Sequence, residues 1–171
     1  MTALSKKVCL LGDFSVGKTS LVRRFVYDLF DDKYITTIGV KVSRKTVVIP
    51  RESDLAEVTM MLWDLAGSEK FDRVRASYVR GTAGAVLVCD LTRPETLDHL
   101  QVYADDLLSV SPDARLIMAA NKCDLTDQQQ LGAEQIETLA CERDMPYYLT
   151  SAKTGDEVEH LFRHLGRLML A

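Results

Sequence analysis

The sequence predicts an α/β fold in which helices cover both faces of a six-stranded, mostly parallel sheet. Two observations carry this prediction. Short apolar runs alternate along the chain with segments of helical periodicity. Several of these runs lack polar alternation, which is typical of strands that are covered on both faces. The length of 171 residues suits one domain, so we expect a single domain over residues 1–171.

The predicted elements follow one another in a regular order. The first strand run is Val8–Leu11 and the first helix is Thr19–Tyr27. The runs Val40–Ile49 and Glu57–Trp63 are separated by a short polar segment, which is typical of a hairpin. The later elements are predicted as a strand at Ala85–Asp90, a helix at Leu97–Leu108, a strand at Leu116–Asn121, a helix at Ala133–Arg143, a strand at Tyr147–Thr150 and a helix at Glu157–Leu170.

The composition argues against several classes of protein. The net charge of −4 disfavours general nucleic-acid binding, which usually requires a basic face. The four cysteines form no C-x-x-C pair, so neither a zinc site nor a redox motif is indicated. No apolar run approaches the ~20 residues of a membrane span. This pattern predicts a cytoplasmic protein with no transmembrane segment.

The two ends of the sequence show no lipid anchor. Thr2 excludes N-myristoylation, and the last residues, 167–171, contain no cysteine for prenylation. We therefore expect either a protein that works off the membrane or a domain of something longer.

The first chemical motif directly follows the first strand run. It reads Gly12-Asp13-Phe14-Ser15-Val16-Gly17-Lys18-Thr19 and fits the G-x-x-x-x-G-K-[ST] phosphate loop. The glycines of such a loop let backbone N–H groups turn toward phosphate oxygens. Lys18 supplies positive charge, and the Thr19 hydroxyl is suited to Mg²⁺. We call residues 12–19 the phosphate loop.

The second chemical motif reads Asn121-Lys122-Cys123-Asp124 and follows another apolar run. An Asn and an Asp at the mouth of a strand can read the edges of a planar base. Because ligands bind at the carboxyl ends of the strands in such sheets, we expect the two motifs to meet there. Together they predict a nucleotide site, with guanine as the base.

At these residues the chain resembles the small GTPases of the Ras superfamily, and within them the Rab branch. The resemblance spans residues 6–170 and is carried by five further motifs in the right order, namely Thr36–Val40, Trp63–Gly67, Lys70-Phe71, Ser77–Gly81 and Thr150–Lys153. It implies the P-loop GTPase fold, or G domain. It also implies a molecular switch that binds GTP or GDP with Mg²⁺ and hydrolyses GTP.

The resemblance implies roles for residues around the phosphates. Thr19 and Thr37 would supply hydroxyls to one Mg²⁺, and Asp64 would hold that ion through water. Gly67 would offer its backbone N–H to the γ-phosphate. The residues implied in catalysis are Lys18, Thr37, Gly67 and Ser68.

The resemblance also implies how the base is read. Asp124 would accept hydrogen bonds from the guanine N1–H and 2-amino groups, which adenine cannot satisfy. Asn121 would read the other edge, Lys122 would cover the base face, and the Ala152 N–H would meet the guanine O6. The residues implied in nucleotide binding are Gly12, Asp13, Phe14, Ser15, Val16, Gly17, Lys18, Thr19, Ser20, Phe30, Tyr34, Asn121, Lys122, Asp124, Ser151, Ala152 and Lys153.

Some of these residues have simpler interpretations. Phe30 would pack edge-on against the guanine and Tyr34 could close over the phosphates, but Phe30 taken alone is as easily a core aromatic. Ser151 could merely brace its loop, which is the role we favour. His160 and His164 stand four apart on the last predicted helix, and a solvated helix face explains them better than a metal site.

Two departures from the family pattern bear on catalysis. Ser68 stands where the family usually has a Gln that orients the attacking water. Phe14 stands in the phosphate loop where a small residue is common, near the place where an arginine finger would enter. We expect slow intrinsic hydrolysis and poor accommodation of such a finger, unless Glu69, Arg73 or Arg75 replaces the missing group.

Partner surfaces are implied by the resemblance as well. Exchange factors, activators and effectors would bind through Asp31–Gly39 and Gly67–Arg75, which should order around the γ-phosphate and loosen after hydrolysis. Val42 stands where Rab-like proteins often have an aromatic residue, but Trp63 and Phe71 still allow an apolar patch between these segments.

Other functions stay open on the sequence alone. The chain could be a hydrolysis-deficient scaffold that stays loaded with GTP, for which Ser68 and Phe14 argue. It could also be the GTPase domain of a larger protein. An ATPase is disfavoured, because Asn121 and Asp124 would then be misplaced.

Overall fold

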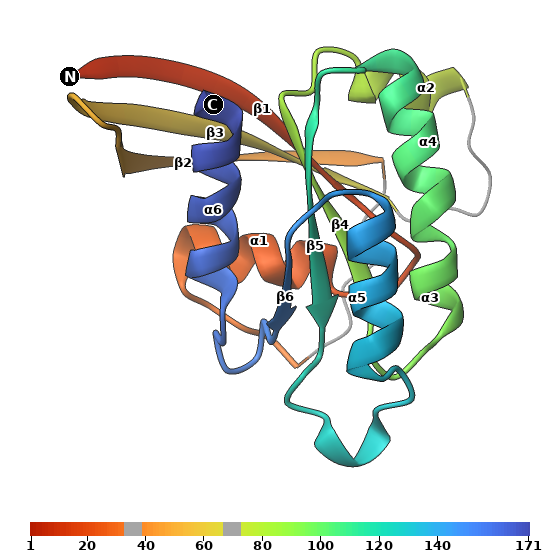
Figure 1. Cartoon of the computed structure of the whole chain (residues 1–171). Coiled ribbons are helices and arrows are strands. Elements are labelled where there is room, and N and C mark those ends of the chain that lie inside the picture. Colours follow the sequence, from red (N-terminus) through yellow and green to blue (C-terminus); the bar gives the residue numbers. More distant parts are fainter. Residues whose placement is uncertain (33–38, 67–72) are drawn as a thin grey trace.

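The computed structural model describes residues 1–32, 39–66 and 73–171, with the side chains of residues 73–75 excepted. In these residues six strands form one sheet in the order β2-β3-β1-β4-β5-β6 (Figure 1). The strands are β1 (Thr2–Leu11), β2 (Val40–Pro50), β3 (Leu55–Leu65), β4 (Gly84–Asp90), β5 (Arg115–Asn121) and β6 (Tyr147–Thr150). The β2–β3 pair is antiparallel and the other neighbouring pairs are parallel. The predicted fold class is therefore confirmed.

Helices cover both faces of this sheet (Figure 1). One face carries α1 (Lys18–Tyr27) and α6 (Val158–Leu170), whose Phe25 and Phe162 rings stack with centroids 4.2 Å apart. The other face carries α2 (Arg73–Val79), α3 (Glu95–Asp98), α4 (Leu100–Val110) and α5 (Ala133–Glu142). Each helical layer buries its own apolar cluster against the sheet, which explains why β4 is buried along its whole length.

The predicted hairpin is present between β2 and β3. The two strands pair from Val40 opposite Leu65 down to Pro50 opposite Leu55. The turn is closed by Arg51, whose Nε donates to Asp54 Oδ1 at 2.8 Å and whose backbone N–H donates to the Asp54 carbonyl at 2.8 Å. The polar segment that suggested the hairpin is thus the turn itself.

The largest differences from the prediction concern three parts of the chain. The strand β1 begins at Thr2 instead of Val8, because residues 2–7 pair with β3 alone and carry no apolar run. The helix α2 was not predicted, since its seven residues are too few for a clear helical period. The single helix predicted at residues 97–108 is divided into α3 and α4 at His99.

The parallel strands bring the predicted motifs to one edge of the sheet. The strand β1 ends directly before the phosphate loop, and β5 ends at Asn121, the first residue of the second motif. Thr150 ends β6, and the 3₁₀ helix η1 (Thr126–Gln128) follows the second motif. Because β1, β5 and β6 run in the same direction, their carboxyl ends border one region.

Candidate functional site

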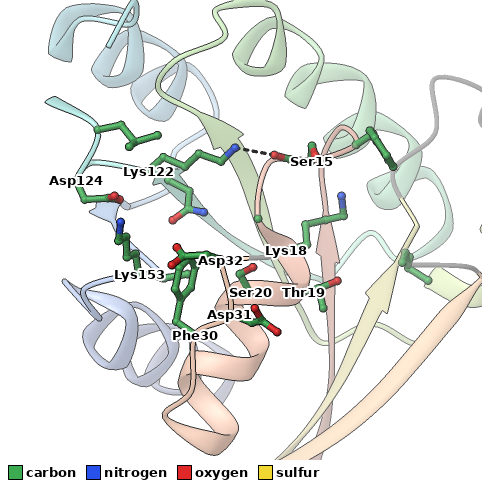
Figure 2. A pocket seen from close by; sticks show the side chains of 16 residues that line it. Ser15, Lys18, Thr19, Ser20, Phe30, Asp31, Asp32, Lys122, Asp124 and Lys153 are labelled. Carbon is green, nitrogen blue, oxygen red and sulfur yellow. Dashed lines mark hydrogen bonds between the residues drawn. The ribbon is translucent and has the colours of Figure 1, made fainter. Parts of the chain in front are cut away.

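A pocket of about 330 Å³ lies at the carboxyl ends of the strands. Figure 2 shows the 16 residues that line it, with Asp124 and Lys153 toward one side and Lys18 and Thr19 toward the other. Twelve of the sixteen are predicted nucleotide-binding residues, namely Phe14, Ser15, Gly17, Lys18, Thr19, Ser20, Phe30, Asn121, Lys122, Asp124, Ala152 and Lys153. Such a volume is in the range of small-molecule sites.

The phosphate loop depends on two glycines. Gly12 has φ +152°, and a Cβ there would lie 2.3 Å from the Val88 carbonyl oxygen. Gly17 has φ +105°, and a Cβ there would lie 2.2 Å from Asn121 Nδ2. Both positions therefore exclude a side chain, because the loop passes too close to β4 and to the second motif.

Lys18 lies at the centre of the phosphate loop. Its Nζ donates to the carbonyl oxygens of Gly12 at 2.9 Å and Asp13 at 2.8 Å, and the residue is buried. The ammonium group is thus held inside the curve of the loop, at the floor of the pocket. A buried cation that lines a pocket directly after a glycine-containing loop is a setting that favours phosphate oxygens.

Thr19 and Asp64 meet beside Lys18. The Thr19 hydroxyl donates to Asp64 Oδ2 at 2.5 Å, and Asp64 is buried at the end of β3. Hydroxyl and carboxylate oxygens are the ligands that Mg²⁺ prefers, so the two residues fit this ion. The third predicted ligand, Thr37, lies outside the described residues.

The second motif is tied to the phosphate loop by two side chains. Asn121 Nδ2 donates to the Val16 carbonyl at 3.0 Å, while its Oδ1 accepts from Thr150 Oγ1 at 3.0 Å. Lys122 Nζ donates to the Ser15 carbonyl at 2.9 Å, the contact drawn in Figure 2. Asn121, at the end of β5, therefore joins the phosphate loop to the end of β6 in addition to bordering the pocket.

Asp124 is oriented by the loop after β6. Ser151 Oγ donates to Asp124 Oδ1 at 2.7 Å and itself accepts from the Thr154 N–H at 3.1 Å. Arg24 of α1 holds the same loop, since its Nε donates to the Ala152 carbonyl at 2.8 Å. The carboxylate consequently faces the pocket from a loop that two separate elements brace.

The phosphate loop is also held from the side of α3 and α4. His99 Nδ1 lies 2.5 Å from Asp13 Oδ2, and the Tyr103 hydroxyl donates to Asp13 Oδ1 at 3.1 Å. Arg93 Nη2 donates to the Phe14 carbonyl at 2.8 Å. The sequence held no local signal for these three residues, because each lies far along the chain from its partner.

The two phenylalanines of the site differ in their surroundings. Phe14 lines the pocket and is 51% exposed. Phe30 lines the pocket as well, but it also packs against the apolar cluster under α1 and α6. Both the core interpretation and the pocket interpretation of Phe30 therefore have contacts that support them.

Several predicted or missed residues complete the description. Tyr34, Thr37, Gly67, Ser68 and Glu69 lie outside the described residues, as do the side chains of Arg73 and Arg75. Gly12, Asp13, Val16, Asp64 and Ser151 support the pocket without being among its lining residues. Four lining residues were not among the predicted nucleotide-binding residues. Asp31, Asp32 and Leu65 lie within segments that the sequence analysis named, and Leu125 directly follows the second motif.

The two histidines of α6 bind different partners. His160 Nδ1 lies 3.3 Å from Glu157 Oε2, and His164 Nδ1 lies 2.9 Å from the Tyr148 hydroxyl.

Among the residues that the structure describes, none of the helices has the length and apolar character needed to cross a bilayer.

Comparison with models of protein families matches residues 7–171 to the family described as Ras family. The match covers nearly the whole chain, including every described element of the pocket. It agrees with the resemblance inferred from the motifs at the level of the superfamily.

Proposed function

Because the chain belongs to the Ras family, whose members are GTP-binding switches and GTPases, we propose that its pocket binds GTP and GDP together with Mg²⁺. The observation that carries this proposal is the contact between the two motifs at one pocket. One wall offers phosphate-binding groups at one end and Asp124 at the other. A nucleotide has the same polarity, with phosphates at one end and a base at the other.

Asp124 would select guanine. Its carboxylate can accept two hydrogen bonds from the N1–H and 2-amino groups of guanine, and Ser151 holds it in one orientation. Adenine would leave the half-buried carboxylate without these donors, which costs binding energy. The Ala152 backbone N–H and the stem of Lys122 would then meet the remaining edge and the face of the base.

Lys18, Thr19 and Asp64 would act on the phosphates. The Lys18 ammonium lines the pocket next to the loop carbonyls of Gly12 and Asp13, and it would bind phosphate oxygens there. Thr19, Asp64 and Thr37 would hold Mg²⁺, which supplies charge neutralisation at the β- and γ-phosphates. The backbone N–H of Gly67 would meet the γ-phosphate from the other side.

We propose that hydrolysis is slow without a partner protein. Ser68 is too short to orient the attacking water as a glutamine does. The half-exposed ring of Phe14 stands at the mouth of the pocket, where it would obstruct an arginine finger of the usual geometry. An arginine finger raises the rate of GTP hydrolysis by roughly 10³–10⁵-fold. Losing this acceleration would therefore matter more than losing the intrinsic hydrolysis rate.

We propose the Rab branch as the subfamily, on the five motifs that carry the resemblance.

The surface around Trp63 is the partner surface that we propose. Trp63 lies under Lys7, whose Nζ is 3.9 Å from the ring centroid, and its ring centroid is 6.3 Å from that of Tyr78. Val42 is exposed opposite Trp63 in the hairpin. This apolar surface, together with residues 31–39 and 67–75, would bind effectors, exchange factors and activators. The cytoplasmic location and the single domain stay predictions.

A hydrolysis-deficient scaffold is the alternative that a specific observation favours. Phe14 is half-exposed where it lines the pocket, and a ring that obstructs an arginine finger there would keep the protein loaded with GTP. The buried set of Lys18, Thr19 and Asp64 argues for retained activity.

Single-turnover hydrolysis separates these possibilities. Protein exchanged into GTP would be incubated with Mg²⁺, and the bound GDP and GTP would be separated over time. We expect a half-life of many hours for the wild type and a faster rate for Ser68→Gln. Equal rates for the two proteins would contradict the role given to Ser68, and binding of ATP within tenfold of GTP would contradict the base assignment.

A further inference from the structure

Two cationic side chains, Lys122 and Arg93, each bind both the phosphate loop and the buried carboxylate of Asp90. Asp90 ends β4 and its side chain is 1% exposed. Its Oδ2 accepts from Lys122 Nζ at 2.8 Å and from Arg93 Nε at 3.1 Å. The same Lys122 ammonium donates to the Ser15 carbonyl at 2.9 Å, and the far end of Arg93 donates to the Phe14 carbonyl at 2.8 Å.

The Asp90 carboxylate is held in place by hydrogen bonds and anchors both cations. Its Oδ1 accepts from the Thr92 N–H at 2.8 Å and from the Thr92 hydroxyl at 2.7 Å. Burial alone would raise the pKa of Asp90, but the hydrogen bonds from Lys122 and Thr92 outweigh it and hold that pKa below its usual range. The carboxylate thus stays ionised and fixed, with both oxygens occupied by donors.

The two carbonyls that the cations hold are consecutive in the chain. A loop that binds phosphate must point N–H groups inward, so its carbonyl oxygens have to be turned away from the anion. Ser15 has φ 65°, a left-handed conformation that a serine adopts only with support from its surroundings. Arg93 and Lys122 supply that support, because each donates a hydrogen bond to one of these two carbonyl oxygens.

We propose that Arg93 is a positioning residue for the nucleotide, acting through Phe14. Arg93 belongs to none of the nucleotide motifs and is not among the residues that line the pocket. Phe14, whose carbonyl oxygen Arg93 binds, does line it. Arg93 bridges the Asp90 carboxylate and the Phe14 carbonyl. It thereby fixes the first half of the phosphate loop and the position of the phenyl ring at the pocket mouth. The role rests on the proposed function, since it concerns binding of a guanine nucleotide.

The first test is the release of GDP. We expect GDP to dissociate about three- to fivefold faster from Arg93→Gln than from the wild type, a modest factor because the guanidinium is partly exposed. Arg93→Lys should restore part of the slow release, since an ammonium can still bridge Asp90 and the Phe14 carbonyl.

Arg163 offers a matched control. Its Nε donates to Glu159 at 2.8 Å and its Nη1 donates to the Val48 carbonyl at 3.0 Å, so it makes the same two kinds of contact away from the pocket. Arg163→Gln should release GDP at the wild-type rate. Equal release rates for Arg93→Gln and Arg163→Gln would overturn the inference, whereas a wild type that binds no guanine nucleotide would overturn the proposed function instead.

The second test is a double-mutant cycle with Phe14→Ala, read out as single-turnover GTP hydrolysis. The Phe14 carbonyl remains in that variant, but the ring is gone. If Arg93 acts by placing the ring, Arg93→Gln should change the hydrolysis rate of the protein that keeps Phe14, and it should change the rate of the Phe14→Ala variant much less. Equal changes in both backgrounds would show that Arg93 does not act through the ring. Melting temperatures of the four proteins would identify any general loss of folding.

Discussion

The Ser151 hydroxyl donates a hydrogen bond of 2.7 Å to the carboxylate of Asp124. Ser151 is fully buried, and the Thr154 N–H donates to its oxygen. The bond joins the loop after β6 to the second motif, so the orientation of the proposed base-reading carboxylate depends on a residue of another loop.

Removing either partner should weaken guanine binding, but to different degrees. Asp124→Ala removes the acceptor itself and should reduce GDP affinity by at least about 100-fold, as expected for a lost pair of charge-assisted hydrogen bonds. Ser151→Ala only loosens the carboxylate and should cost about three- to tenfold. Affinities from titration with a fluorescent GDP would measure both.

Ser109→Ala is the control for this pair, because Ser109 is an exposed hydroxyl of α4 that donates only within its own helix, to Asp106. It should bind GDP as the wild type does. An Asp124→Ala protein with unchanged affinity would contradict the placement of the base.

Removing the carboxylate of Asp64 should make GDP release insensitive to metal chelation. Asp64 is buried and accepts from Thr19, so Asp64→Asn keeps the shape of the site but removes its charge. Loss of such a group typically costs about 10- to 100-fold in metal affinity. The measurement is the GDP dissociation rate with Mg²⁺ and with excess EDTA.

In the wild type, EDTA should speed release clearly, whereas Asp64→Asn should release GDP rapidly under both conditions. Asp105→Asn, which alters an exposed carboxylate paired with Arg143, should behave as the wild type. The same EDTA response in Asp64→Asn and the wild type would argue against Asp64 as a magnesium residue.

Two phenylalanines should differ sharply in their effect on stability. Phe162 is fully buried and stacks on Phe25 at 4.2 Å, so Phe162→Ala should lower the free energy of unfolding by about 3–5 kcal/mol. Phe14 is half-exposed, so Phe14→Ala should change it by about 0.5 kcal/mol or less. Urea denaturation of both variants would test this contrast, and comparable losses would show that Phe14 has a role in the core.

The thiol of Cys89 should make stability fall at alkaline pH. Burial, and then the charge of Asp90, raises the pKa of Cys89 from 9.0 to about 12. Above pH 9 the unfolded thiol loses its proton while the folded one keeps it, so the free energy of unfolding decreases as pH rises. Between pH 8 and pH 10 we expect a loss of about 1 kcal/mol from this group.

Denaturation at the two pH values would measure that loss in three proteins. Cys89→Ala should reduce the difference, although Cys9, whose pKa burial also raises, will keep part of it. Cys141 is exposed, so Cys141→Ala should retain the full difference. An undiminished pH dependence in Cys89→Ala would contradict the assignment.

Local patterns predicted the elements that carry strong local signals. The predicted runs became the six strands, and those at the end of β1, in β4 and in β5 are apolar on both faces because helices cover both sides there. Residues 2–7 and α2 escaped prediction because one is a strand with a single partner and the other is a short helix. Their structure depends on neighbours that the sequence pattern does not name.

The sequence by itself determined which motifs border the pocket. The glycines of the phosphate loop, Lys18 and the second motif stand at strand ends, where any parallel sheet would bring them together. Only the tertiary structure decided what holds that site in place. Arg93 binds Phe14 and His99 binds Asp13 across long stretches of chain. These contacts arise from the packing of α3 and α4 beside the phosphate loop, and packing between distant segments leaves no periodicity or motif in the sequence.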